Sequence, residues 1–131
     1  MDVLVTGGAG FIGSHTCVEL IDAGHNVIVV DDLSAGYVEA VDRVGEITGT
    51  RPVLEVADIT DAAAMESVFA RHHVDAIIHF AARKAVGEST EIPLEYFHTN
   101  VTGTVTLLQA AQRAGVGRMV FSSSCSIYGD T

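Results

Sequence analysis

Short apolar runs and longer amphipathic stretches alternate along the chain. Runs rich in β-branched residues, bounded by Gly, Pro or polar residues, predict buried strands over residues 3–5, 27–30, 52–56, 76–80 and 118–121. Apolar residues at helical spacing predict helices over residues 11–22, 37–49, 61–72 and 93–114. Residues 81–89 show neither pattern and predict an irregular loop. Because strands and helices alternate throughout 131 residues, we expect one α/β domain with a doubly wound parallel sheet.

The first predicted strand leads directly into a glycine-rich turn. Gly8, Gly10 and Gly13 follow the pattern Gly-x-Gly-x-x-Gly, Gly7 stands just before it, and the first helix begins at once. Such glycines allow a tight turn, let a diphosphate approach the backbone, and let the helix pack close to the strand. The start of the helix then offers free N–H groups and a positive dipole end to phosphates. This strand–turn–helix context favours a dinucleotide site over an ordinary glycine-rich turn.

The second predicted strand ends in Asp31 and Asp32. An acidic residue about 20 residues after the glycine motif accepts hydrogen bonds from an adenosine ribose. No Arg or Lys stands close to Asp31 in the sequence, so a 2′-phosphate would meet a carboxylate and no cation. We therefore predict NAD rather than NADP as the cofactor. A turn or helix-capping role for Asp31 stays open, and Asp32 or Ser34 fits that role equally well.

Loops after the other strands carry further candidate residues, at the edge where such a sheet binds ligands. Asp58 and Ile59 follow the third strand. Lys84, the single lysine of the chain, lies in the loop after the fourth strand. It suits a phosphate or ribose contact and a solvated surface position equally well. The serines of residues 122–126 leave the fifth strand at the same edge, which favours a binding site over a plain polar turn.

Charge and composition exclude several classes of function. The net charge is −10, from 17 acidic and 7 basic residues, which argues against nucleic acid and anionic membranes as partners. No apolar run approaches membrane-spanning length, and no basic region precedes the first apolar run, so we expect a cytoplasmic protein without a signal peptide. Cys17 and Cys125 are expected to be free thiols, and no spacing of Cys or His predicts a metal site.

Three stretches together resemble the N-terminal part of the UDP-glucose 4-epimerases, a family of extended short-chain dehydrogenases/reductases. They are Thr-Gly-Gly-Ala-Gly-Phe-Ile-Gly-Ser-His at residues 6–15, the stretch containing Lys-Ala-Val-Gly-Glu-Ser at residues 79–89, and Ser-Ser-Ser with Tyr-Gly-Asp at residues 122–124 and 128–130. The second stretch is the most specific to the epimerases. The resemblance covers essentially all of residues 1–131. It implies an NAD-binding Rossmann-like domain, truncated after the fifth strand and lacking the substrate domain.

The resemblance also implies a reaction and a set of site residues. NAD would take a hydride from C4 of the sugar and return it to the other face, which interconverts UDP-galactose and UDP-glucose. Ser124 would be catalytic, through a hydrogen bond to the reacting hydroxyl. The cofactor contacts assigned by the motif and by the resemblance are Gly7, Gly10, Phe11, Ile12, Gly13, Asp31, Asp32, Asp58, Ile59, Phe80, Ala81, Lys84 and Thr99. Within this set, the resemblance places Phe11 and Ile12 at the diphosphate and Asp58 and Ile59 at the adenine. It places Phe80, Ala81 and Lys84 at the nicotinamide half.

The base of this family is the tyrosine of a Tyr-x-x-x-Lys motif after the fifth strand, and the 131 residues contain no such motif. Tyr128 belongs to a different stretch of the family pattern. We therefore expect an N-terminal fragment of a UDP-hexose epimerase that is inactive alone. Two alternatives stay open: a stand-alone NAD-binding module that senses or binds a partner, and another sugar-nucleotide epimerase or dehydratase of the same superfamily.

The long helix predicted near residues 91–114 carries two stripes at helical spacing. The first stripe consists of Leu94, Phe97, Val101, Val105 and Leu108, and the second of Tyr96, Thr99, Gly103 and Leu107. Epimerases of this kind usually dimerise through this helix, so the resemblance implies a homodimer when the enzyme is complete. The competing explanation is that both stripes pack within one chain. The fifth strand, residues 119–121, is expected to form an apolar sheet edge.

Overall fold

Five apolar runs pair into a single parallel sheet in the computed structural model, which describes residues 1–129. The strands are β1 (Asp2–Thr6), β2 (Asn26–Asp31), β3 (Val53–Val56), β4 (Ala76–His79) and β5 (Met119–Phe121). Their order across the sheet is β3-β2-β1-β4-β5, and all pairs are parallel. The chain thus winds outward in both directions from β1, which confirms the predicted doubly wound sheet. The order switches between β1 and β4, where such sheets open a crevice at their carboxyl ends.

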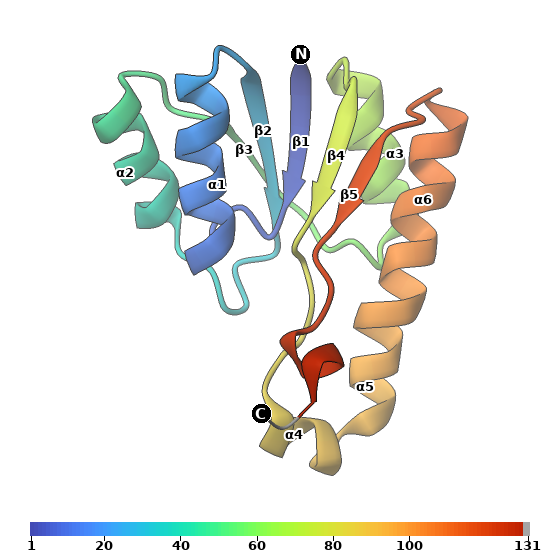
Figure 1. Ribbon diagram of the computed structural model, residues 1–131. Coiled ribbons are helices and arrows are strands. Elements are labelled where there is room, and N and C mark those ends of the chain that lie inside the picture. The colour runs from blue at the N-terminus through green and yellow to red at the C-terminus, as the bar shows by residue number, and fades with distance from the viewer. Residues whose placement is uncertain (130–131) are drawn as a thin grey trace.

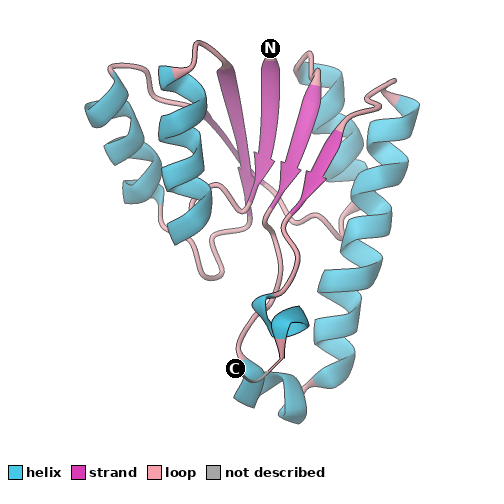
Figure 2. Cartoon of the chain, viewed as in Figure 1, coloured by secondary structure: helices cyan, strands magenta, loops and turns pink. Residues whose placement is uncertain are grey.

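Helices cover both faces of the sheet (Figures 1 and 2). One side carries α1 (Phe11–Asp22) and α2 (Val38–Thr48), and the other carries α3 (Ala62–Arg71) and α6 (Gly103–Arg113). Successive residues of β1 point to opposite faces and feed two cores. Val3 and Val5 pack with buried residues of α1 and α2, whereas Leu4 packs with buried residues of α3 and α6. Two separate cores follow from the near-continuous apolar character of the strands.

Local sequence signals set the helix ends close to where they were predicted. Asp61 caps α3, because its side chain accepts a hydrogen bond from the N–H of Ala64 at 3.0 Å. Gly49 ends α2 in the left-handed region, with φ of 78°, where a side chain would be strained. Both features were readable in the sequence, which explains why the predicted bounds hold within a few residues.

Two predictions along the second half of the chain need correction. Residues 81–89 are not all irregular, because Val86–Glu91 form a short helix, α4. The helix predicted from Pro93 to residue 114 is not one α-helix: α5 (Pro93–Phe97) passes through a π-helical turn (His98–Thr102) into α6. Polar residues dominate α4, so no apolar period marked it. Across the π-helical turn the apolar residues keep spacings of three and four positions, so the sequence pattern did not reveal the change of helix type.

The sheet ends at β5 within the described residues. Val120 and Phe121 are 63% and 58% exposed, which agrees with the predicted apolar edge. Cys17 is buried and Cys125 exposed, and both are free thiols as expected. Among residues 1–129, no helix is long and apolar enough to cross a membrane.

Candidate functional site

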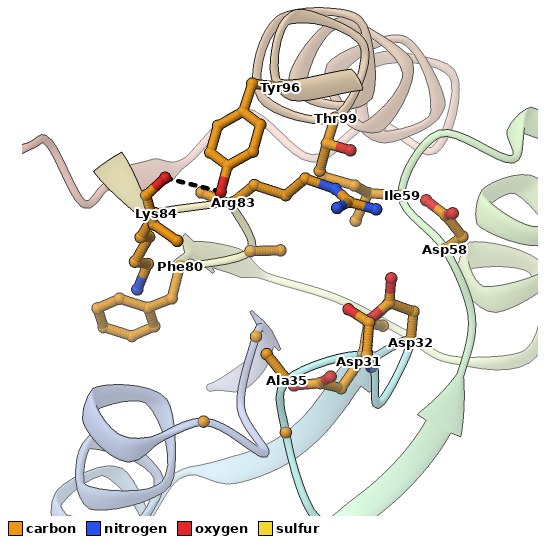
Figure 3. A pocket seen from close by; sticks show the side chains of 18 of the residues that line it. Asp31, Asp32, Ala35, Asp58, Ile59, Phe80, Arg83, Lys84, Tyr96 and Thr99 are labelled. Carbon is orange, nitrogen blue, oxygen red and sulfur yellow. Dashed lines mark hydrogen bonds between the residues drawn. The ribbon is translucent and has the colours of Figure 1, made fainter. Parts of the chain in front are cut away.

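A pocket of about 450 Å³ lies where the carboxyl ends of β1 to β4 meet α5 and the π-helical turn after it (Figure 3). The structure brings together eleven of the thirteen residues predicted to hold a cofactor: Gly7, Gly10, Phe11, Asp31, Asp32, Asp58, Ile59, Phe80, Ala81, Lys84 and Thr99. They come from five separate segments, so only the fold makes them neighbours. Ile12 and Gly13 do not line the pocket.

The glycine turn is built for close approach between backbones. Gly7 adopts φ of 70°, and its N–H donates to the carbonyl of Val30 at 2.8 Å, which ties the turn to β2. A Cβ on Gly13 would lie 2.2 Å from the carbonyl oxygen of Gly7. Gly13 therefore serves the packing of α1 on the turn and not the pocket wall. No side chain caps the start of α1, which leaves its first N–H groups for a ligand.

Asp31 serves the turn as well as the pocket. Its carboxylate accepts hydrogen bonds from the N–H groups of Ala9 at 3.0 Å and Leu33 at 2.9 Å, and the residue is only 8% exposed. The structural role that the sequence left open for Asp31 is therefore present. Each carboxylate oxygen has a further lone pair, so the same group retains acceptor capacity towards the pocket that it lines.

Asp32 and Asp58 form matching turns at the ends of neighbouring strands. Asp32 accepts hydrogen bonds from the N–H and the hydroxyl of Ser34, at 2.9 and 2.7 Å. Asp58 accepts hydrogen bonds from the N–H and the hydroxyl of Thr60, both at 2.8 Å. Side chains that bond to the backbone two residues on stabilise such turns locally. Asp32 and Asp58 are thus held by local turns where they line the pocket.

A buried hydrogen-bonded chain connects β1 and β4 to the π-helical turn. The hydroxyl of Thr104 donates to the carbonyl of Asn100 at 2.7 Å, so it accepts from Nε2 of His79 at 2.9 Å. Nδ1 of His79 is then the acceptor for the hydroxyl of Thr6, which in turn accepts the N–H of Ala81 at 3.2 Å. Donors and acceptors balance only for the neutral Nε2–H tautomer. Burial lowers the pKa of His79 to about 4, which keeps the ring neutral at neutral pH.

The loop after β4 is held by hydrogen bonds from α5 and from the π-helical turn that follows it. The side chain of Asn100 accepts from the N–H of Arg83 at 2.8 Å and donates to its carbonyl at 3.0 Å. The hydroxyl of Tyr96 donates to the carbonyl of Ala85 at 3.0 Å and lies 3.2 Å from Glu88. Burial and the hydrogen bond to Glu88 raise the pKa of Tyr96. These contacts fix the backbone that presents the Arg83 and Lys84 side chains.

Among the pocket residues that the sequence analysis missed, Arg83, Glu88 and Tyr96 carry ionisable side chains. Arg83 stands beside the predicted Lys84, and its charge was the available signal. Glu88 and Tyr96 belong to α4 and α5, and only the folding of this region over the pocket places them there.

Ser124, the predicted catalytic residue, lies at the start of a 3₁₀ turn (Cys125–Tyr128) outside the pocket lining. Its oxygen accepts from the N–H of Ser126 at 3.2 Å and lies 2.6 Å from the Ser126 hydroxyl. The side chain is exposed, and its hydrogen bonds close the local turn. Its catalytic role stays a prediction.

Comparison with protein families gives a match over residues 3–131 to the NAD dependent epimerase/dehydratase family. The chain belongs to this family. Among curated relatives, the UDP-glucose 4-epimerase of Bacillus subtilis (strain 168) is 54% identical over 129 residues, and that of Drosophila melanogaster is 52% identical over 134. Each alignment covers 98% of this chain and 38% of the relative. The family member described here thus spans well under half the length of these relatives.

Solved structures agree with this placement in the NAD dependent epimerase/dehydratase family. The UDP-glucose 4-epimerase from Stenotrophomonas maltophila with bound NAD and formylated UDP-arabinopyranose has a TM-score of 0.95 at 53% identity. It matches 100% of this chain and 39% of that one. The enzyme from Bifidobacterium longum in complex with NAD⁺ and UDP also has a TM-score of 0.95, at 45% identity over 98% of this chain and 38% of that one.

Proposed function

We propose that this chain is the dinucleotide-binding part of an enzyme that interconverts UDP-galactose and UDP-glucose, and that it binds NAD. The observation that carries the proposal is the meeting of the glycine turn, Asp31 and the Lys84 loop in one pocket at the switch point of the sheet. Relatives and neighbours named as UDP-glucose 4-epimerases, some crystallised with NAD, support it.

The residues present fit a dinucleotide. The backbone at Gly7 lies so close to the next loop that a Cβ there would be 2.9 Å from the nitrogen of Ala81. The uncapped start of α1 offers N–H groups of Phe11 and its neighbours to a diphosphate. Asp31 offers its remaining lone pairs to the adenosine ribose, and Lys84 offers a charge to the other half. Together these groups supply the acceptors and donors that the two halves of the cofactor need.

Bound NAD would supply the acceptor and donor of a hydride at C4 of the sugar. The chain itself contributes binding and orientation of the cofactor, through the glycine turn and the loop held by Asn100 and Tyr96. We propose that Ser124 hydrogen-bonds the hydroxyl that loses its proton. We further propose that the complete enzyme acts on a UDP-hexose as a homodimer.

A dehydratase acting on another sugar nucleotide is the nearest alternative, since the family name covers both reactions. Substrate assays separate the two: UDP-galactose is converted to UDP-glucose by an epimerase, whereas a dehydratase releases water and leaves a keto sugar. A stand-alone binding module would hold the dinucleotide without either reaction.

Titration of the protein with NAD and NADP tests the cofactor assignment. We expect NAD to bind more than about tenfold tighter, which is about 1.4 kcal/mol, because a 2′-phosphate would be placed against Asp31. Asp31→Asn removes the charge and keeps one of the two oxygens that accept from Ala9 and Leu33, so it should narrow this preference, and thermal unfolding checks that the variant is folded. Asp42→Asn, which changes an exposed acid paired with Arg51, is the matched control. Equal affinities of the wild-type protein for the two cofactors would contradict the assignment.

A further inference from the structure

The pocket proposed to hold a diphosphate is rich in negative charge. Four acidic side chains line it: Asp31, Asp32, Asp58 and Glu88. Arg83 and Lys84 are the two basic residues among the described residues that line it. Carboxylates around a cavity repel a diphosphate unless nearby cations offset them. The placement of these two cations therefore decides where phosphate oxygens are tolerated.

The two cations serve different ends of the pocket. Figure 3 shows the amine of Lys84 pointing towards Phe80, while the guanidinium of Arg83 extends across the pocket towards the side where Asp58 and Ile59 lie. In the proposed function the first side takes the nicotinamide half and the second takes the adenosine half. Lys84 alone would thus leave the acidic, adenosine side of the pocket without a positive charge.

The Arg83 side chain is anchored at its base and loosely held at its tip. Asn100 holds its backbone through two hydrogen bonds, of 2.8 and 3.0 Å. The guanidinium lies 3.2 Å from Glu88 and 3.9 Å from Glu95, and the side chain is 40% exposed. Exposed ion pairs of this kind add little stability. A guanidinium binds a phosphate through two parallel charge-assisted hydrogen bonds, which are stronger.

We propose that Arg83 exchanges Glu88 and Glu95 for the adenosine-side phosphate of the bound dinucleotide, and so completes a two-cation site with Lys84. This assignment rests on the proposed binding of NAD. Asn100 already fixes the backbone of Arg83, so the exchange would involve movement of the side chain.

Binding measurements on Arg83→Gln test the assignment with three probes: NAD, ADP-ribose and adenosine. We expect the variant to bind NAD and ADP-ribose about tenfold more weakly, or worse, because each carries the adenosine-side phosphate. Adenosine lacks it, so its affinity should not change. The affinity of Arg83→Lys for NAD and ADP-ribose should lie between those of the wild type and Arg83→Gln. Lysine keeps the charge but cannot make the two parallel hydrogen bonds of a guanidinium. Arg113→Gln is the control, because Arg113 is an exposed arginine paired with Glu66 outside the pocket lining.

Thermal unfolding first shows whether the variant is folded. The binding results then test the phosphate contact of Arg83 separately from the proposed binding of NAD. Wild-type affinity of Arg83→Gln for NAD and ADP-ribose would overturn the role of Arg83 while leaving NAD binding intact. An equal loss for adenosine would place the contact on the nucleoside and overturn the phosphate assignment. A wild-type protein that binds neither NAD nor ADP-ribose would overturn the proposed function and this inference together.

Discussion

His79 in β4 joins β1 to the start of α6 through a single neutral imidazole. Its two ring nitrogens bond to hydroxyls of Thr6 and Thr104, and one arrangement of protons satisfies the whole chain. A second proton would make both ring nitrogens donors and would leave the Thr6 hydroxyl without its acceptor. The folded structure therefore requires the neutral form of His79. Protonation of the ring should be measurable as a loss of stability.

We expect the free energy of unfolding to fall as the pH is lowered from about 6.5 towards 4. The pKa of His79 is about 4 when folded, against an ordinary value of 6.5, so the unfolded chain binds more protons in this window. Stability then rises with pH, by up to about 1.4 kcal/mol per pH unit. Urea unfolding at several pH values measures it. His79→Gln should flatten this part of the profile, whereas the exposed His98→Gln should not.

Pocket residues differ in how far their place in the pocket could be predicted from the sequence around them. Gly10 and Asp31 could be predicted as pocket residues, because the glycine motif and an acid at the end of the second strand are local signals. Arg83 could be read as a charge but not as a pocket residue, because the bonds from Asn100 that fix its backbone join segments 17 positions apart. Tyr96 and Glu88 gave no signal of a place in the pocket, since that position depends on how α4 and α5 fold over the loop.

Among the elements, α1 depends most directly on its sequence motif. A Cβ at Gly13 would lie 2.2 Å from the carbonyl oxygen of Gly7 and 2.8 Å from the Cα of Gly8. Both are backbone atoms that no rotamer change can move away. Gly13 thus sets how closely the helix packs on the turn that is proposed to hold the diphosphate.

Gly13→Ala should lower the free energy of unfolding by about 1–3 kcal/mol or more, the usual cost of overpacking, and should weaken NAD binding. Gly87→Ala in α4 is the matched control, because a Cβ there meets nothing within 4 Å and alanine favours a helix. Urea denaturation of both variants gives the comparison. Equal stability of Gly13→Ala and wild type would show that the turn is not as tightly packed as the structure has it.

The strands and the longer helices could be predicted from the sequence, whereas the short helix α4 and the π-helical turn could not. Strand runs and helix ends carry local signals, such as the capping side chain of Asp61 and the glycine at position 49. The short helix α4 is held by contacts from Tyr96 and by side chains that bond back within it, including Ser89 to the carbonyl of Val86. Such a helix is stabilised by its neighbours, so its own residue pattern could not predict it.

At the scale of the whole molecule, the helical segment after Pro93 leaves a large apolar stripe in solvent. The second predicted stripe is the inward one, since Tyr96, Gly103 and Leu107 are buried. The first stripe is exposed by 43% to 81% along its length, at Leu94, Phe97, Val101, Val105 and Leu108. Contiguous apolar surface of this kind marks an interaction site. It supports the proposed homodimer.

Phe97→Glu should shift the protein towards the monomer, because it would place a charge in the centre of an apolar interface. Light scattering over a range of concentrations measures the mass. Ile47→Glu is the control, since Ile47 is an equally exposed apolar residue on α2, away from the stripe. A complete wild-type enzyme that stays monomeric at high concentration would contradict the dimer. Equal effects of the two variants would show that the interface is not centred on the stripe.

The polypeptide of 131 residues should not epimerise UDP-galactose by itself. A hydroxyl such as that of Ser124 is a poor base at neutral pH without a partner to activate it, and its hydrogen bonds in the described residues go to Ser126. His79 is buried and has both ring nitrogens engaged, so it cannot take the proton. Positioned proton transfer contributes about 10²–10⁴-fold in rate, and this contribution should be missing.

An assay of the purified polypeptide with UDP-galactose and NAD, repeated after addition of the C-terminal portion of a UDP-glucose 4-epimerase, separates the outcomes. Turnover only in the presence of the second portion would support the chain as the dinucleotide-binding part, because the base and the nucleotide-sugar contacts would then come from the added polypeptide. The exposed sheet edge at β5 offers a surface on which such a portion could assemble. Turnover by the 131-residue polypeptide alone would contradict this account, and would require a base among its own residues.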